Sequence, residues 1–202
     1  MNSRKINVIT LGCSKNLVDS EVLMRQIEAQ GIEVVHDAPD SDAGTIIINT
    51  CGFIQDAKQE SIDTILEYVK EKEEGRLESL FVMGCLSERY KSELVKEIPE
   101  VDQYFGVNDI RQVISRLGGD LKKELLGERK LITPAHYAYL KISEGCDRKC
   151  SFCAIPLIRG RQQSKSIEVI IRETELLVEK GVKELILIAQ DLTAYGTDLY
   201  GD

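Results

Sequence analysis

The chain has 202 residues, of which 43% are hydrophobic, and its formal net charge is −8. This length and apolar content suffice for one large domain or two small ones, whereas the acidic balance argues against strong, salt-driven binding to nucleic acid. The chain starts with polar residues rather than a long apolar run, so we expect a cytoplasmic protein with no signal peptide or membrane span. In that compartment its six cysteines are better explained as ligands or reactive thiols than as disulfides.

Strands and helices alternate over the first part of the chain. Short β-branched or apolar runs predict strands at residues 5–12, 32–35, 45–49, 80–83 and 103–107. Apolar residues at helical spacing predict a helix after each of these strands except the second, and Ser87 and Asn108 are candidate caps for the last two helices. This order implies a parallel sheet covered on both faces. We therefore predict a doubly wound, flavodoxin-like α/β domain over residues 1–118.

Three cysteines occupy equivalent places in this plan. Cys13, Cys51 and Cys85 each follow a predicted strand and precede a predicted helix. The carboxyl ends of parallel strands share one edge of the sheet, where open α/β sheets bind their ligands. A single cysteine there could be a small buried hydrophobe, but three in equivalent positions favour ligation. Asn16, Lys15 and Asn49 are candidates for shaping such a site.

The rest of the chain predicts a second, smaller unit. Residues 119–136 mix charges with glycine and proline and indicate a linker. A strand at 138–142, a helix begun by Ser166 and ended by Gly181, and a strand at 184–189 then form a βαβ unit over 137–202. Because a closed eight-stranded (β/α) barrel takes about 250 residues, we expect a truncated first βαβ unit of such a barrel and a polypeptide that continues beyond Asp202.

The most informative stretch is the loop with Cys146, Cys150 and Cys153, spaced Cys-x3-Cys-x2-Cys. Structural zinc sites take four ligands, and the fourth would have to be His136 or come from outside the protein. Three thiolates instead match an iron–sulfur cube whose fourth iron stays open for a substrate or cofactor. A zinc or redox scaffold whose cysteines only stabilise loops is the non-enzymatic alternative.

This spacing resembles the signature of the radical S-adenosylmethionine enzymes. The segments 11–21, 49–54, 83–86 and 142–146 further resemble those of the methylthiotransferases within that group, and the resemblance covers essentially the whole chain. It implies two 4Fe-4S clusters. One, on Cys146, Cys150 and Cys153, would bind S-adenosylmethionine and cleave it to a 5′-deoxyadenosyl radical; an auxiliary one, on Cys13, Cys51 and Cys85, would carry the sulfur to be inserted.

The resemblance also points to one branch of that family. Gly12-Cys13-Ser-Lys-Asn16 is similar to the branch that adds a methylthio group to the β-carbon of an aspartate in small-subunit ribosomal protein S twelve. The branch that modifies an adenosine in tRNA tends to read Gly-Cys-Gln-Met-Asn and is the alternative. The implied partners are that ribosomal protein as substrate and an electron donor of the flavodoxin or ferredoxin type, with no membrane and no strong nucleic-acid binding.

Four further polar residues are candidate cofactor contacts. Arg159 and Arg161 follow the cysteine loop, and they could either contact the cofactor carboxylate or the substrate, or be solvated loop charges. Gln190 and Asp191 lie at the carboxyl end of the last predicted strand, where cofactor contact is expected but turn-forming residues are also common.

Overall fold

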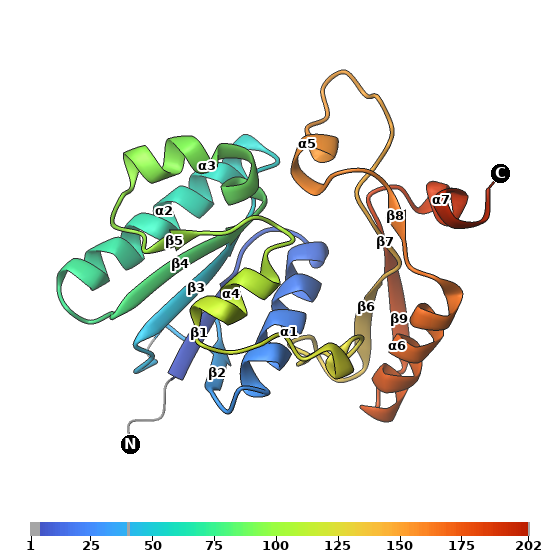
Figure 1. The fold of residues 1–202 in the computed structure, drawn as a ribbon, viewed down its shortest axis with the longest axis horizontal. Coiled ribbons are helices and arrows are strands. Elements are labelled where there is room, and N and C mark those ends of the chain that lie inside the picture. The colour runs from blue at the N-terminus through green and yellow to red at the C-terminus, as the bar shows by residue number, and fades with distance from the viewer. Residues whose placement is uncertain (1–4, 40, 202) are drawn as a thin grey trace.

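The structure is a computed structural model, which describes residues 5–39 and 41–201 (Figure 1). A five-stranded parallel sheet has the order β2-β1-β3-β4-β5. Its strands are β1 (Lys5–Thr10), β2 (Glu33–His36), β3 (Thr45–Thr50), β4 (Ser79–Gly84) and β5 (Gln103–Tyr104). The helices between and after them are α1 (Ser14–Glu28), α2 (Gln55–Glu73), α3 (Cys85–Glu97) and α4 (Ile110–Arg116). The predicted element order and the flavodoxin-like strand order are confirmed.

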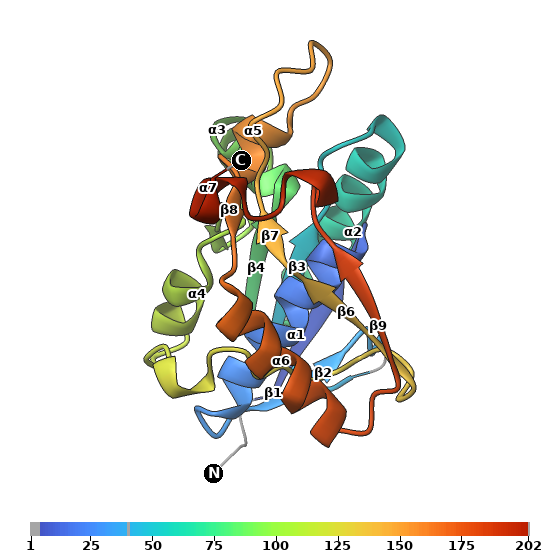
Figure 2. The ribbon, with the colours of Figure 1, turned by 90° about the vertical axis from the view of Figure 1, so that its right-hand side faces the viewer.

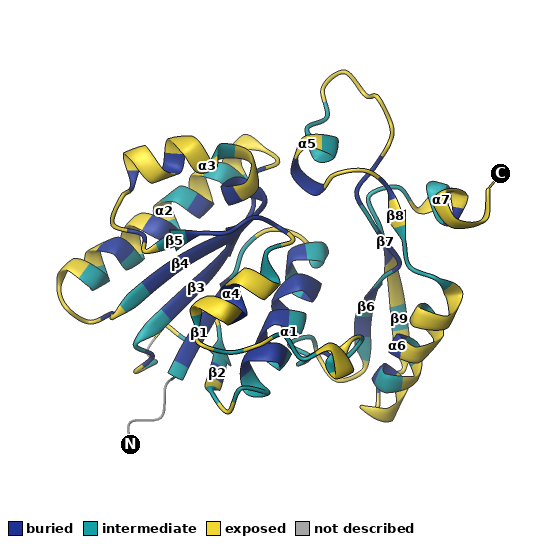
Figure 3. Cartoon of the chain, in the orientation of Figure 1, coloured by how far each residue is buried: buried dark blue, intermediate teal, exposed yellow. Residues whose placement is uncertain are grey.

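The sheet is buried on both faces because its central strands are apolar throughout. Successive side chains of a strand point to opposite faces, so Ile46 and Ile48 pack with α2 and α3 on one side, whereas Ile47 packs with α1 and α4 on the other. Figure 3 shows the central strands as the most deeply buried part of the molecule. Each such side chain contributes about 1.5–3 kcal/mol when fully buried.

The helices on this sheet are amphipathic surface helices. The longest of the described helices, α2, has 19 residues and is rich in charge. No helix within residues 5–39 and 41–201 is both long and apolar enough to cross a membrane.

The start of α3 differs from the prediction. Ser87 was expected to cap this helix, but α3 begins at Cys85, and its N-cap is Gly84 with φ 100. Because glycine adopts positive φ without a steric penalty, the chain turns directly from β4 into α3. The thiol of Cys85 therefore lies in the first turn of a helix. Asn108 was likewise expected to be an N-cap, but the N-cap of α4 is its neighbour Asp109.

The second unit is built around β6 (Tyr137–Lys141) and β9 (Glu184–Ile188), which pair in parallel on either side of α6 (Ile167–Glu179) in the chain. Leu140 and Leu177 are buried in its small core. The predicted βαβ unit is confirmed, and Figure 2 shows α6, β6 and β9 in front of α1 and the large sheet.

Several short elements of this unit were not predicted. They are β7 (Ser143–Glu144), α5 (Ile155–Arg159), β8 (Gln163–Ser164), the 3-10 turn η2 (Leu192–Ala194) and α7 (Thr197–Tyr200). β7 and β8 pair antiparallel and close the base of the cysteine loop.

Residues 119–136, expected to be a linker, pack closely against α1. They contain the 3-10 turn η1 (Lys123–Leu125), and the backbone N–H of Lys130 donates to the carbonyl of Glu21 in α1. Arg129 forms a buried ion pair with the side chain of Glu21 and donates to the carbonyl of Tyr139 in β6. The segment therefore joins the large sheet and the second unit through α1.

Candidate iron-sulfur centre

The three upstream thiols lie at the carboxyl edge of the sheet. Cys13 follows β1, Cys51 follows β3 and Cys85 follows β4, and these three strands are neighbours in the order β1-β3-β4. Adjacent strands are about 4.8 Å apart. Strand order reverses between β1 and β3, and such a switch point is where open α/β sheets place their ligands. The predicted convergence of the three thiol turns is confirmed by this topology.

Glycines bring the thiol turns into direct contact. A β-carbon added at Gly12, beside Cys13, would lie 2.6 Å from the β-carbon of Cys51 and 3.0 Å from its sulfur. One added at Gly52 would lie 2.6 Å from the α-carbon of Leu86, in the turn of Cys85. Since real β-carbons do not approach other atoms so closely, only glycine at these two positions allows the turns to pack at this distance.

Two asparagines hold the same turns in register. Asn16 donates from Nδ2 to the carbonyls of Leu11 at 2.9 Å and Thr50 at 3.0 Å, which bridges the turns after β1 and β3. Asn49 donates in turn to the carbonyl of Asn16 at 2.9 Å. Both asparagines are almost completely buried, so their amides replace the backbone partners that these turns lack. The expectation that they shape the upstream site agrees with this geometry.

Cys85 lies in a buried environment beside a positive charge. Burial raises its pKa to about 11, and the positive charge of Arg159 opposes this rise. Arg159 Nη2 donates to Cys85 Sγ at 3.4 Å. Cys85 also packs with Ile158 of α5. The second unit therefore reaches the upstream thiols both through an apolar contact and through a charged one.

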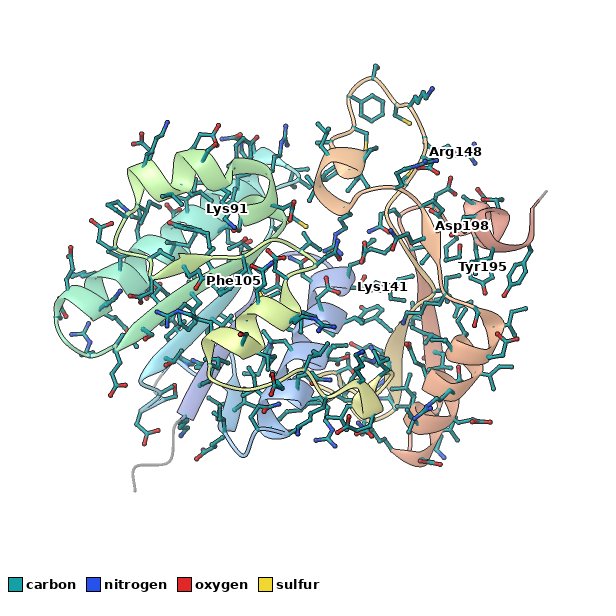
Figure 4. The ribbon with its side chains drawn as sticks, viewed as in Figure 1. Lys91, Phe105, Lys141, Arg148, Tyr195 and Asp198 are labelled. Carbon is teal, nitrogen blue, oxygen red and sulfur yellow. The ribbon has the colours of Figure 1, made fainter. Side chains whose placement is uncertain are left out.

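Arg159 is the centre of a buried charge network between the two units. Its guanidinium donates to Asn16 Oδ1 at 2.6 Å, Asp19 Oδ2 at 3.1 Å and Glu144 Oε2 at 3.0 Å, and the residue is 3% exposed. Lys141 forms ion pairs with the same two carboxylates, Asp19 and Glu144. Figure 4 shows Lys141, at the end of β6, on the side of the second unit that faces α1.

Two cations and two anions balance in this network. Burial alone would raise the pKa of Glu144, but Lys141 and Arg159 outweigh it and lower the pKa to about 2. Burial would likewise lower the pKa of Arg159, yet Asp19, Cys85 and Glu144 keep it above its usual value. Glu144 and Arg159 are therefore charged near neutral pH.

The downstream thiols lie on the long loop between β7 and α5. Cys146 is buried, Cys153 is half-buried and Cys150 is exposed. The backbone N–H of Cys146 donates to the carbonyl of Gly160 at 3.1 Å, and its sulfur accepts from the backbone N–H of Arg148 at 3.4 Å. The first thiol is thus anchored to the end of α5, whereas the other two project with the loop.

The four candidate cofactor residues have different surroundings. Arg159 is not a solvated loop charge, because its guanidinium is buried against Cys85; Arg161 has an 87% exposed side chain and an ion pair with Asp147. Gln190 Nε2 donates to Glu144 Oε1. Hydrogen bonds from Thr193 and the charge of Arg148 lower the pKa of Asp191 to about 2. Contact of any of these residues with a cofactor stays a prediction.

The residues around both sets of thiols fit a bound group. Ser87 Oγ, two residues after Cys85, and Ser143 Oγ, three residues before Cys146, are buried atoms without a hydrogen-bond partner, as is Oε1 of Gln190, whose Nε2 donates to Glu144. Within residues 5–39 and 41–201, no three His, Cys, Asp or Glu side chains are arranged so that they could hold one metal ion. An iron–sulfur cube takes each thiolate on a different iron, so its ligands need not converge on one point. The donor set and the glycine-lined turns suit such a cube better than a single zinc ion.

His136 lies apart from the cysteine loop. It precedes β6, whereas Cys146 follows the opposite end of that strand, and five strand residues span about 16 Å. It is exposed and stacks edge-on against Tyr137. His136 is therefore not positioned to act as a fourth metal ligand together with the thiols of the cysteine loop.

These features define an α/β protein with two sets of three thiols, one on a flavodoxin-like sheet and one on the loop of a βαβ unit. Residues 5–106 match the model described as "Uncharacterized protein family UPF0004", and residues 140–200 match the "Radical SAM superfamily". The chain belongs to family UPF0004, and its second unit carries the start of a radical S-adenosylmethionine domain. This match supports S-adenosylmethionine and iron–sulfur chemistry at the cysteine loop.

Curated relatives are similar along the whole chain. The "Ribosomal protein uS12 methylthiotransferase RimO" of Flavobacterium johnsoniae is 61% identical over 201 residues, which is 99% of this chain and 46% of that protein. The proteins of the same name from Bacteroides thetaiotaomicron and Cytophaga hutchinsonii are 59% identical over 99% of the chain and 54% identical over 97%, covering 46% and 45% of their own lengths. The chain therefore spans about half the length of these relatives.

Proposed function

We propose that this chain forms the cluster-bearing part of a radical S-adenosylmethionine methylthiotransferase that modifies an aspartate of ribosomal protein uS12. The observation that carries the proposal is the contact of Arg159, at the base of the cysteine loop, with Cys85 of the upstream site. It joins two separate three-thiol sets, each with one ligand fewer than a cube needs. The names of the curated relatives support the substrate.

Each set has its own role in this proposal. Cys146, Cys150 and Cys153 would hold one 4Fe-4S cluster, and Cys13, Cys51 and Cys85 a second. When bound, these clusters and S-adenosylmethionine would supply the radical that removes hydrogen from the aspartate β-carbon and the sulfur that replaces it. The buried network of Arg159, with the asparagines of the sheet edge, would hold the turns of the upstream thiols in place.

The remaining assignments follow from the same proposal. Gln190 and Asp191, at the carboxyl end of β9, would face the cofactor together with Arg161, while Arg159 would act from the side of the upstream site. Residues 1–118 and 137–202 would be the two domains, joined through 119–136. A ribosomal substrate implies a cytoplasmic location, and the reaction requires a flavodoxin- or ferredoxin-type electron donor.

Iron analysis of the full-length natural protein tests the two-cluster part. Anaerobic reconstitution is expected to give about eight irons per chain, as two cubes require. Cys13→Ala and Cys146→Ala are each expected to lower this to about four. The control His136→Ala should keep about eight, because His136 lies apart from the cysteine loop. Four irons that are unchanged by Cys13→Ala would remove the upstream site.

The substrate is tested separately in a strain that lacks the gene. Mass spectrometry of uS12 and of tRNA shows which of them loses the mass of a methylthio group. Loss from uS12 alone supports the proposal, and re-expression of the full-length protein should restore it. Loss from tRNA alone would assign the protein to the tRNA-modifying branch instead.

A further inference from the structure

We infer that Arg159 is a positioning residue that raises the reduction potential of the upstream cluster through the sulfur of Cys85. The inference rests on the proposed function, because it concerns a cluster on Cys13, Cys51 and Cys85. The sequence suggests Arg159 as a contact of S-adenosylmethionine. The inference instead assigns its side chain to the upstream thiols.

The geometry around the Cys85 sulfur carries this inference. Arg159 Nη2 lies 3.4 Å from Cys85 Sγ, and its Nη1 is held by Asp19 Oδ2 at 3.1 Å and Glu144 Oε1 at 3.1 Å. Asn16 Oδ1 accepts from the same Nη2 at 2.6 Å. These partners fix the guanidinium plane, so the position of the donor at the sulfur does not depend on a flexible side chain.

Burial makes the contact electrostatically effective. Arg159 and Cys85 are 3% and 6% exposed, so water screens their interaction far less than it screens a surface pair. Reduction adds one electron to an iron–sulfur cluster without breaking a thiolate bond, and a nearby positive charge or sulfur hydrogen bond favours the more negative, reduced form. Arg159 therefore shifts the potential upward.

The surrounding charges predict effects of both signs. Lys141 and Arg159 are opposed by Asp19 and Glu144 in one network. Removal of the Arg159 charge leaves a net negative network beside the cluster and removes a donor to sulfur. Neutralisation of Asp19 instead leaves a net positive network. The two changes should move the potential in opposite directions, which a general loosening of the structure would not do.

The experiment uses the full-length protein with Cys146, Cys150 and Cys153 replaced by alanine, so that any cluster lies on the upstream thiols. The potential is read from the electron paramagnetic resonance signal during an anaerobic titration with dithionite and mediators. Arg159→Gln is expected to lower the potential and Asp19→Asn to raise it. Arg159→Lys, which keeps the charge but loses the planar fork, should lie between the parent and Arg159→Gln.

Arg172→Gln is the matched control, because it removes the same charge from an exposed position on α6 and should leave the potential unchanged. If Arg159→Gln binds no cluster, Arg159→Lys tests the inference instead, and its reduction potential should fall below that of the parent by a smaller amount. Iron present with unmoved potentials, or with shifts of the same sign in Arg159→Gln and Asp19→Asn, overturns this inference alone. A parent that binds no iron overturns both the inference and the proposed function.

Discussion

Arg129 Nη1 lies 2.9 Å from Glu21 Oε2, and the two side chains are 2% and 1% exposed although 108 positions separate them in the chain. Glu21 also accepts from the backbone N–H of Ile132 at 3.0 Å. Burial raises the pKa of Glu21 despite the opposing N–H of Ile132 and charge of Arg129. A buried pair of this kind holds residues 119–136 on α1.

Arg129→Met should therefore destabilise the protein strongly. The substitution keeps the volume of the side chain but leaves the Glu21 carboxylate buried without its counter-charge, at a cost of about 3–5 kcal/mol. Urea unfolding measures the change. The double variant Glu21→Gln/Arg129→Met should recover part of the loss because no lone buried charge remains.

Arg76→Met serves as the control for this experiment. Arg76 pairs with Glu74 on the surface, with side-chain exposures of 56% and 41%, and such pairs contribute about 0–1 kcal/mol. Equal effects of the two substitutions would contradict the role assigned to the buried pair.

Gly12→Ala should disrupt the upstream thiol site. Gly12 has φ +90, and the added methyl would lie 2.6 Å from the β-carbon of Cys51. The left-handed conformation itself costs a non-glycine residue about 1–2 kcal/mol, and the clash pushes apart the turns of Cys13 and Cys51. In the reconstituted full-length protein, iron should fall toward half of the wild-type value.

Gly31→Ala distinguishes the cost of the left-handed backbone conformation from the effect of the clash with Cys51. Gly31 has φ +75, but nothing lies within 4 Å of its added β-carbon, so only the conformational cost applies. Its iron content should match that of the wild type. Loss of iron in both variants would mean that backbone strain, and not contact with Cys51, is responsible.

His36 should make the protein less stable as the solution becomes mildly acidic. Its Nε2 lies 2.9 Å from Thr10 Oγ1, and burial lowers its pKa from 6.5 although Asp37 opposes the shift. Since the unfolded state takes up the proton first, stability falls as the pH drops through 6.5 toward the lower folded value. Urea midpoints at several pH values measure this loss, which His36→Gln should reduce.

Nuclear magnetic resonance provides a direct check on the same group. The imidazole signal of His36 is assigned by its disappearance in His36→Gln. A His36 midpoint above 6.5 would contradict the expected direction.

Gln26→Ala should loosen the contact between α1 and residues 119–136. The Gln26 side chain donates to the carbonyl of Lys122 at 3.0 Å and accepts from its backbone N–H at 2.9 Å. Loss of both hydrogen bonds should cost about 2 kcal/mol and speed hydrogen exchange at Lys122. Gln112→Ala, which removes an exposed side-chain contact with Asp109, should leave exchange at Lys122 unchanged. Unaltered exchange in Gln26→Ala would show that other contacts hold the segment.

Local patterns were sufficient to predict most of the fold. Runs such as 45–49 are apolar and β-branched throughout, which suits a strand buried on both faces, and β3 formed there. Helix starts were less predictable, because Ser87 carries a capping side chain while the positive φ of Gly84 decides where α3 begins. Short elements such as β7 and α5 have too few residues to show a period.

The candidate site was predictable where topology alone positions a residue. Cys13, Cys51 and Cys85 each follow a strand, and parallel strands bring their carboxyl ends to one edge. Arg159 was not predictable in this way, since its partners Asn16 and Cys85 are 143 and 74 positions away. Nothing in the sequence near Arg159 indicates which of the two sites its side chain contacts.

The alternation of strands and helices, the sheet-edge thiols and the three-cysteine loop were predictable from the sequence, because periodicity and spacing act over a few residues. The packing of residues 119–136 against α1 and the contact of Arg159 with the upstream thiol became evident from the structure. Both depend on how α1 meets the second unit, where buried charges require partners from distant parts of the chain.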